Sequence, residues 1–234
     1  MTDAVGAAGT APERWLQIPD PVDRADLVAF LTRAVSLDEA AVVRLRQRRD
    51  GLLSAWVNTG FDALAVRVLR GTVAPPDTTV AADGLRAILV AAGDDGVDPG
   101  RAMDSVRRGA LPPETGYVHL DDVPARILVD LAQRGVALSR EQGQGPPSSL
   151  LAQEVLEVAG GGERAGVPMR LVFALNAMGF VPTGGARATA EIDLDRIDPA
   201  EVVRVRATAT WLRLDARYGS VYLRRGGGLG LSVR

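Results

Sequence analysis

The chain of 234 residues contains no cysteine, no lysine and a single histidine, His119. Without cysteine it can form no disulfide, no zinc site with thiolate ligands and no Cys–His nucleophile pair. Without lysine, Schiff-base catalysis and a Walker phosphate-binding loop are excluded, because both need the lysine amine. One histidine also excludes a metal site with several histidines in one chain. Several large classes of enzyme are therefore ruled out.

The sequence is also poor in aromatic residues, long apolar runs and net charge. No apolar run approaches the roughly 18 to 20 residues that a membrane-spanning helix needs. Residues 1–13 lack the basic and apolar regions of a signal peptide. The net charge of −2 gives no whole-chain attraction to nucleic acid or to an anionic membrane. We therefore expect a cytoplasmic protein without a membrane partner.

What the chain does contain is typical of a globular protein: 47% hydrophobic and 24% charged residues. Its patterns predict an α+β fold, with a helix and antiparallel β-meander first, a helical middle segment, and a second antiparallel β unit last. The predicted parts are a disordered tail (1–14), an α+β unit with a three-stranded meander (15–73), a mainly helical segment (74–181), and a β unit with a Gly-rich tail (182–234).

The first unit begins with a helix over residues 20–35, where Asp20 can cap the first N–H groups and Pro21 suits the first turn. Residues 42–71 then alternate as strands do. If residues 49–51 form a three-residue loop with Gly51 in the left-handed region, strand partners sum to 100. Apolar side chains then share one side, and the other side carries Arg44, Arg46, Arg48 and Trp56. We expect the third strand to add Leu64, Val66 and Val68 to the apolar side and Arg67 to the polar side.

In the middle segment, apolar spacing and helix-starting residues predict helices beginning at 85, 98, 122, 150 and 168. The helix expected from Asp98-Pro99 runs through Met103 and Val106. The helix expected over residues 150–159 has the sequence LLAQEVLEVA. Residues 116–120 could form a short strand. The apolar surface of residues 150–181 exceeds one helical stripe and suggests a central core or, alternatively, a homodimer interface.

Residues 38–46 (DEAAVVRLR) and 198–206 (DPAEVVRVR) agree at six positions. An apolar helix precedes each stretch and a tryptophan follows it, which favours duplication of an α+β unit. Against this, Trp211 falls on the opposite alternation from Arg204 and Arg206 unless a β-bulge intervenes. The two explanations are therefore an internal duplication and two unrelated sheets of similar composition.

Arginines that alternate with an aromatic residue on an open sheet resemble, in physical type, surfaces that stack bases and neutralise phosphates. The competing interpretation is that arginine stems cover a half-exposed tryptophan, and that the acidic middle segment of the same chain pairs with them. The candidate binding residues are Arg44, Arg46, Arg48, Trp56, Arg204 and Arg206.

No residue pattern predicts a catalytic group, a metal site or a cofactor. His119 lies near Asp121 and Asp122, but no G-x-S-x-G sequence provides a nucleophile for a Ser–His–Asp arrangement. Whether the chain is an enzyme stays undecided, with the pattern leaning against it.

Three hypotheses for function follow. The leading one is a non-catalytic cytoplasmic binding or regulatory protein whose partner is another protein or a second copy of the chain. The alternative is a nucleic-acid-binding protein that uses the arginine and tryptophan side of the sheet. The third is a small-molecule-binding protein or an enzyme, with a pocket between the helical middle segment and a sheet.

Overall fold

The computed structural model describes residues 14–92, 96–107, 109–141, 146–183 and 192–226. The predicted tail over residues 1–14 lies outside these residues except for Arg14, as does most of the Gly-rich end. The elements, in chain order, are β1 (Trp15–Gln17), α1 (Pro21–Leu37), β2 (Val42–Gln47), β3 (Leu52–Asn58), β4 (Leu64–Arg70), β5 (Thr72–Ala74), β6 (Asp77–Ala81), α2 (Ala82–Ala91), η1 (Asp104–Val106), β7 (Val118–Pro124), α3 (Ala125–Glu141), α4 (Ser148–Ala152), β8 (Glu154–Gly160), β9 (Glu163–Pro168), α5 (Met169–Ala177), η2 (Leu194–Arg196), β10 (Val202–Ala207), β11 (Trp211–Ala216) and β12 (Gly219–Arg224).

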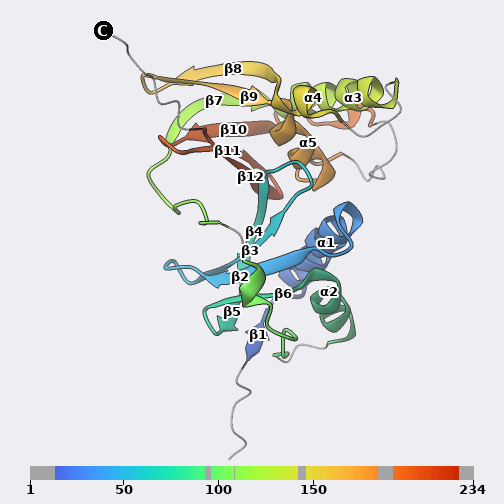
Figure 1. The fold of residues 1–234 in the computed structure, drawn as a ribbon, viewed down its shortest axis with the longest axis vertical. Helices are drawn as coiled ribbons and strands as arrows, with labels where there is room; N and C mark the ends of the chain where they lie inside the picture. The colour runs from blue at the N-terminus through green and yellow to red at the C-terminus, as the bar shows by residue number, and fades with distance from the viewer. Residues whose placement is uncertain (1–13, 93–95, 108, 142–145, 184–191, 227–234) are drawn as a thin grey trace, which may run out of the picture.

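An eight-stranded antiparallel sheet joins the two halves of the chain, in the order β6-β2-β3-β4-β12-β11-β10-β7. Two small two-stranded sheets, β1-β5 and β8-β9, accompany it. The long helices gather on one side of the large sheet (Figure 1), where their apolar side chains form one continuous core with it. The fold is α+β, as predicted.

The large sheet has an internal symmetry of strand order. Reading outward from the central β4–β12 pair, β3, β2 and β6 follow on one side, and β11, β10 and β7 on the other. Strand β6 leads into α2 and β7 leads into α3, so the two edge strands also correspond. The order along the chain differs, because β6 and α2 follow their meander whereas β7 and α3 precede theirs. The two halves therefore match in strand order and differ in connectivity.

The repeated stretch has the same hydrogen bonds in both copies. The Ala41 N–H donates to the Asp38 carbonyl at 2.9 Å, and the Glu201 N–H donates to the Asp198 carbonyl at 2.9 Å. In each case the same aspartate also accepts, through its carboxylate, the N–H two residues later, at 2.9 and 2.8 Å. The repeat thus encodes one turn that starts a strand, used twice.

The start of the neighbouring helix is set by the same stretch. The Ala82 N–H, at the start of α2, donates to the Ala41 carbonyl at 2.9 Å, and the Ala125 N–H, at the start of α3, donates to the Glu201 carbonyl at 2.8 Å. Together with the matching strand order, these contacts are consistent with an internal duplication.

The first hairpin has the predicted register. Val43 lies opposite Val57 and Leu45 opposite Ala55, and Gly51 has a φ of 80°, which glycine adopts without strain. The corresponding hairpin of the second half, between β10 and β11, has a shorter loop, because the Thr208 N–H donates to the Trp211 carbonyl at 2.8 Å. Its register therefore pairs even with odd numbers. Trp211 shares the face of Arg206 without a bulge between these strands, which removes the objection to duplication.

The prediction for the third strand was wrong. Val66 lies opposite Trp56, so Val66 belongs to the side of the sheet away from the helices. Arg67 lies on the helix side, where its guanidinium pairs with Asp26 of α1 and donates to the Tyr218 carbonyl. The cause is the longer connection between β3 and β4, which shifts the alternation by one residue and turns every side chain to the other face.

The middle segment contains the expected helices α2, α3 and α5, together with strands that the sequence did not reveal. Residues 150–159 are not one helix: α4 ends at Ala152 and β8 begins at Glu154. Glycines at 161 and 162, with φ of 59° and 83°, turn this strand into β9. The Val155, Leu156 and Val158 side chains face the core from a strand because β9 supplies backbone partners.

Helices α3 and α5 pack closely on each other. In α3, a Cβ on Gly135 would lie 2.6 Å from the Cζ atom of Phe173 in α5. Glycine at this position therefore permits the contact between the two helices, and α3 continues past it to Glu141. Within the described ranges, no helix is long and apolar enough to cross a membrane.

Candidate binding surfaces

The side of the sheet away from the helices carries the predicted binding residues of the first half, and we call it the arginine face: Arg44, Arg46, Arg48 and Trp56. Arg44 of β2 lies between Trp56 on β3 and Thr79 on β6. Leu45 is fully buried on the other side, so the predicted segregation of apolar and basic side chains on this hairpin is confirmed.

Arg44 is engaged by a carboxylate of its own chain. Its Nε and Nη2 atoms donate to the two carboxylate oxygens of Asp77 at 2.8 and 2.6 Å. The hydrogen bond raises the pKa of Arg44 and lowers the pKa of Asp77. Arg107 approaches the same carboxylate at 3.5 Å. The Arg44 guanidinium is therefore already paired with a carboxylate of its own chain.

Arg48 pairs with Asp50 at 2.7 Å in the hairpin loop, and this hydrogen bond lowers the pKa of Asp50. Arg46 lies half-buried opposite Ser54 and Asp77. Among the described residues, Arg46 has no carboxylate within ion-pair distance.

Trp56 is only 7% exposed. Its ring packs on Tyr222 with centroids 5.1 Å apart, and Leu111 and Tyr117, from the segment that connects the two halves, pack on the same cluster. A buried ring offers no free face for a base to stack on. The arginine face is therefore covered by an apolar cluster at its centre, which the sequence analysis did not foresee.

The candidate residues of the second half are also held within the chain. Arg206 pairs with Asp215 at 2.5 Å, and Arg204 lies 4.0 Å from Asp122 with both side chains half exposed. Asp215 further accepts from Arg213 and Ser220 at 2.5 Å each. Arg204 is thus the most accessible of the predicted arginines on this side.

Arg213 joins this ionic network to the aromatic cluster. Its guanidinium carbon lies 5.3 Å from the ring centroids of both Tyr117 and Tyr222, as in cation–π contacts. Burial raises the pKa of Tyr222 to about 12 and raises that of Tyr117 as well. These groups pack together where the segment that connects the two halves meets the sheet.

His119 lies on β7 beside a carboxylate. Its Nε2 atom lies 3.7 Å from a carboxylate oxygen of Asp122, and both side chains are about half exposed. Within the part of the chain that the structure describes, no group of three or more histidine, aspartate or glutamate side chains could hold a metal ion.

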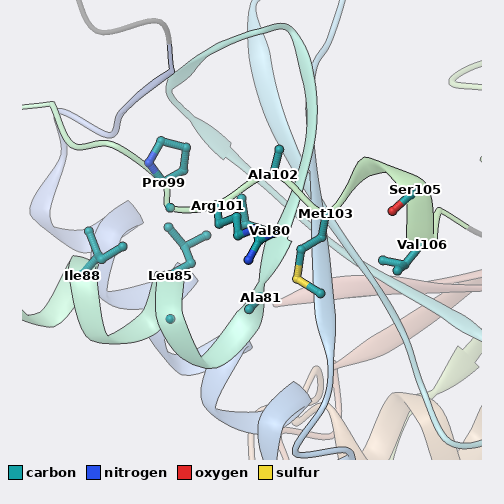
Figure 2. A pocket seen from close by; sticks show the side chains of 12 residues that line it. Val80, Ala81, Leu85, Ile88, Pro99, Arg101, Ala102, Met103, Ser105 and Val106 are labelled. Carbon is teal, nitrogen blue, oxygen red and sulfur yellow. The ribbon is translucent and has the colours of Figure 1, made fainter.

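A groove that the sequence analysis missed lies between α2 and residues 97–106, with a volume of about 480 Å³. Figure 2 shows its side chains, and the ones used below are Val80, Leu85, Ile88, Arg101, Met103 and Val106. Val80 is buried and forms the floor, Leu85 is buried in the wall that α2 provides, and Val106 is 40% exposed at the rim. The groove is mainly apolar with one exposed cation.

The groove exists because residues 98–106 are not the helix that the sequence predicts. Only the single turn η1 forms there. The Met103 N–H donates to the Thr79 carbonyl at 2.8 Å, and the Thr79 N–H donates to the Asp104 carboxylate at 2.8 Å. These bonds hold the segment along the outer edge of β6 and leave a space in front of α2. The helical spacing of Leu85 and Ile88 predicted the helix that forms one wall of the groove, and no sequence pattern predicted the other wall.

Solved structures with a similar fold include the putative DNA polymerase III beta subunit of Eubacterium rectale (TM-score 0.53, 9% identity, 91% of this chain and 65% of that chain). Others are the DNA polymerase sliding clamp of Bacillus subtilis (0.53, 13%, 90% and 64%) and the DNA polymerase beta subunit of Streptococcus pyogenes (0.52, 7%, 91% and 65%). The chain thus spans slightly less than two thirds of these proteins. At such identities, the likeness is one of fold.

No curated protein sequence matches the chain. Two family models match it: "Domain of unknown function (DUF8010)" over residues 11–109 and "Domain of unknown function (DUF8185)" over residues 112–228. Their boundary falls in the segment that connects the two halves of the large sheet. Because the second model matches half of the 234 residues, the chain belongs to the DUF8185 family.

Proposed function

We propose that this chain is a non-catalytic cytoplasmic binding protein that acts through contacts with other proteins. The observation that carries the proposal is the apolar groove beside α2, with the exposed Arg101 next to it. An open apolar surface with a single charged group is typical of a site that recognises another molecule by shape and one ionic contact.

The fold supports this proposal. Some of the solved structures with the same fold carry the name of a polymerase subunit, and a subunit works in assembly with other proteins. The described residues also form a rigid frame, since one eight-stranded sheet connects both halves. A rigid frame with a preformed groove loses little conformational freedom on binding.

The test is purification of the full-length tagged chain from lysate of its own cells, with and without nuclease. We expect a protein to co-elute in near-equal amount and to stay bound after nuclease treatment. The proposal would be contradicted if nuclease treatment removed every co-eluting protein, or if no protein co-eluted even at low salt. Light scattering of the purified chain shows whether the partner is a second copy.

Nucleic-acid binding is the second candidate, favoured by the names of the neighbouring structures, which are DNA polymerase clamps and subunits. The predicted residues limit it. Arg44, Arg48 and Arg206 are in close ion pairs, so Arg46 and Arg204 are the arginines left for phosphates.

Two phosphate contacts predict a slope of log affinity against log salt of about −1.8 for duplex and about −1.4 for single-stranded oligonucleotides. Fluorescence anisotropy with random single-stranded and duplex oligonucleotides measures it, with an Arg46→Glu/Arg204→Glu variant as the comparison. If the chain binds no oligonucleotide at low salt, nucleic-acid binding is excluded. If the variant binds as the wild type does, Arg46 and Arg204 are not the binding residues.

A further inference from the structure

We propose that the groove between α2 and residues 97–106 binds an extended peptide segment of a partner protein, with apolar side chains in the groove and a carboxylate on Arg101. This rests on the proposed function, since it names the site and the chemistry of the protein contact. Three independent features of the described residues support it: the shape of the groove, the free cation and unpaired peptide groups.

The first feature is the apolar lining. Leu85 and Ile88 of α2 form one wall, and Met103 and Val106 form the other (Figure 2). The buried Val80 closes the floor from the sheet. The groove is open along one side, so a side chain can enter it while the backbone that carries it stays outside. A single aliphatic side chain from a partner would bury apolar surface against these walls, which favours binding.

The second feature is Arg101. Its side chain is exposed and lies between Leu85 and Met103 in Figure 2. In the described ranges, Arg101 makes no ion pair or hydrogen bond, whereas its neighbour Arg107 is held by Asp77 and Asp104. A free guanidinium beside apolar side chains favours a carboxylate and disfavours a cation. Charge complementarity therefore indicates an acidic residue in the partner.

The third feature is the backbone of the same segment. The flanking Gly100 and Met103 N–H groups donate to the Asp98 carboxylate and the Thr79 carbonyl. Between them, within the described structure, the N–H groups of Arg101 and Ala102 donate to no protein acceptor. Exposed and unpaired peptide groups next to an edge strand can pair with an added strand. This feature favours an extended peptide over a compact small molecule.

The experiment probes an array of immobilised decapeptides of random sequence with the full-length chain. We expect the bound peptides to share alternating aliphatic residues and an aspartate or glutamate, because alternate side chains of a strand point the same way. Arg101→Glu is expected to weaken these peptides about tenfold, and replacing the peptide's acidic residue by lysine is expected to restore binding to that variant.

Val106→Glu places a charge at the exposed rim and is expected to weaken every selected peptide about tenfold. Matched controls are Arg140→Glu on α3 and Val90→Glu on the outer side of α2, both exposed and outside the groove. These controls are expected to bind as the wild type does. Thermal unfolding of each variant shows that the fold is retained.

The proposal is overturned if no peptide is selected, if selection shows no preference for acidic residues, or if Arg101→Glu binds as the wild type does. A dimer of the chain that Val106→Glu dissociates would also overturn it, because the occupant would be a second copy. If a partner purified from lysate still binds both groove variants, the groove is wrong and the protein-binding function stands. If no partner binds at all, the function itself is wrong.

Discussion

Asp215 is the centre of the ionic network on the second half of the sheet, and its replacement tests how that network stabilises the fold. Its carboxylate accepts hydrogen bonds from Arg206, Arg213 and Ser220, each at 2.5 Å, and its side chain is 11% exposed. The change Asp215→Ala removes all three bonds and leaves two arginines on the same face without their shared anion.

The magnitude follows from the exposure of the partners. Hydrogen bonds to a charged group contribute about 1.5 to 3 kcal/mol each, but burying a carboxylate costs several kcal/mol. The side chains of Arg206 and Arg213 are 33% and 23% exposed, so both regain water contacts when the carboxylate is lost. We expect a net loss of about 2 to 3 kcal/mol, or a Tm lower by about 4 to 12 °C.

The assay is thermal unfolding at neutral pH, followed by circular dichroism. The control is Asp50→Ala, which removes the partner of Arg48 in an exposed loop, where an ion pair is expected to add little. A Tm for Asp215→Ala that equals that of the control would refute the assignment of a stabilising role to the network.

Three further predictions concern packing and pH. Gly135→Ala should destabilise the protein by about 1 to 2 kcal/mol, because its Cβ would lie 2.6 Å from the buried ring of Phe173. In contrast, Gly84→Ala in α2, with open space, should stabilise it by up to about 1 kcal/mol; equal effects in chemical denaturation would contradict this. The lowered pKa of Asp77 means that its contribution is present above the ordinary carboxyl pKa and is lost as the pH falls through the lowered value, so Asp77→Asn should flatten the acid side of a Tm–pH profile. Because burial raises the pKa of Tyr222 to about 12, stability should fall as the pH rises from about 10 to 12, and Tyr222→Phe should reduce that fall.

The first hairpin shows where sequence reasoning succeeds. A glycine at position 51 and strict alternation on both sides allow one register that keeps arginine off the apolar side, and the structure has that register. The third strand shows where it fails. The sequence allows several lengths for the connection between β3 and β4. A change of one residue in that length exchanges the faces of the sheet on which Arg67 and Val66 lie. The choice depends on Asp26 of α1, which is distant in the sequence and holds Arg67.

The segment from Leu150 to Ala159 shows a different limit. Its apolar residues suit a helix, and the local pattern offers no reason for a strand. Only its first residues are helical, and the part from Glu154 onward becomes a strand because β9 pairs with it and the hairpin packs beside β7. Pairing between segments supplies hydrogen bonds that no local pattern reports, so tertiary contacts override the helical preference.

The candidate sites divide in the same way. The sequence was sufficient to place Arg44 and Trp56 side by side, because strand alternation and a turn residue decide which neighbours face each other. The sequence could not show that Asp77 pairs with Arg44 or that Tyr222 packs on Trp56. Asp77 and Tyr222 belong to strands β6 and β12, whose places in the sheet are decided only when the whole chain folds.

The amino-acid sequence by itself determined the α+β class, the repeated turn that starts β2 and β10, and the exclusion of lysine- and cysteine-based chemistry. These depend on local periodicity and on which functional groups exist. Only the tertiary structure decided that the two halves share one sheet, that the centre of the arginine face is covered, and that a groove opens beside α2. Each of these depends on which distant segments meet, and that choice is made by the packing of the whole chain.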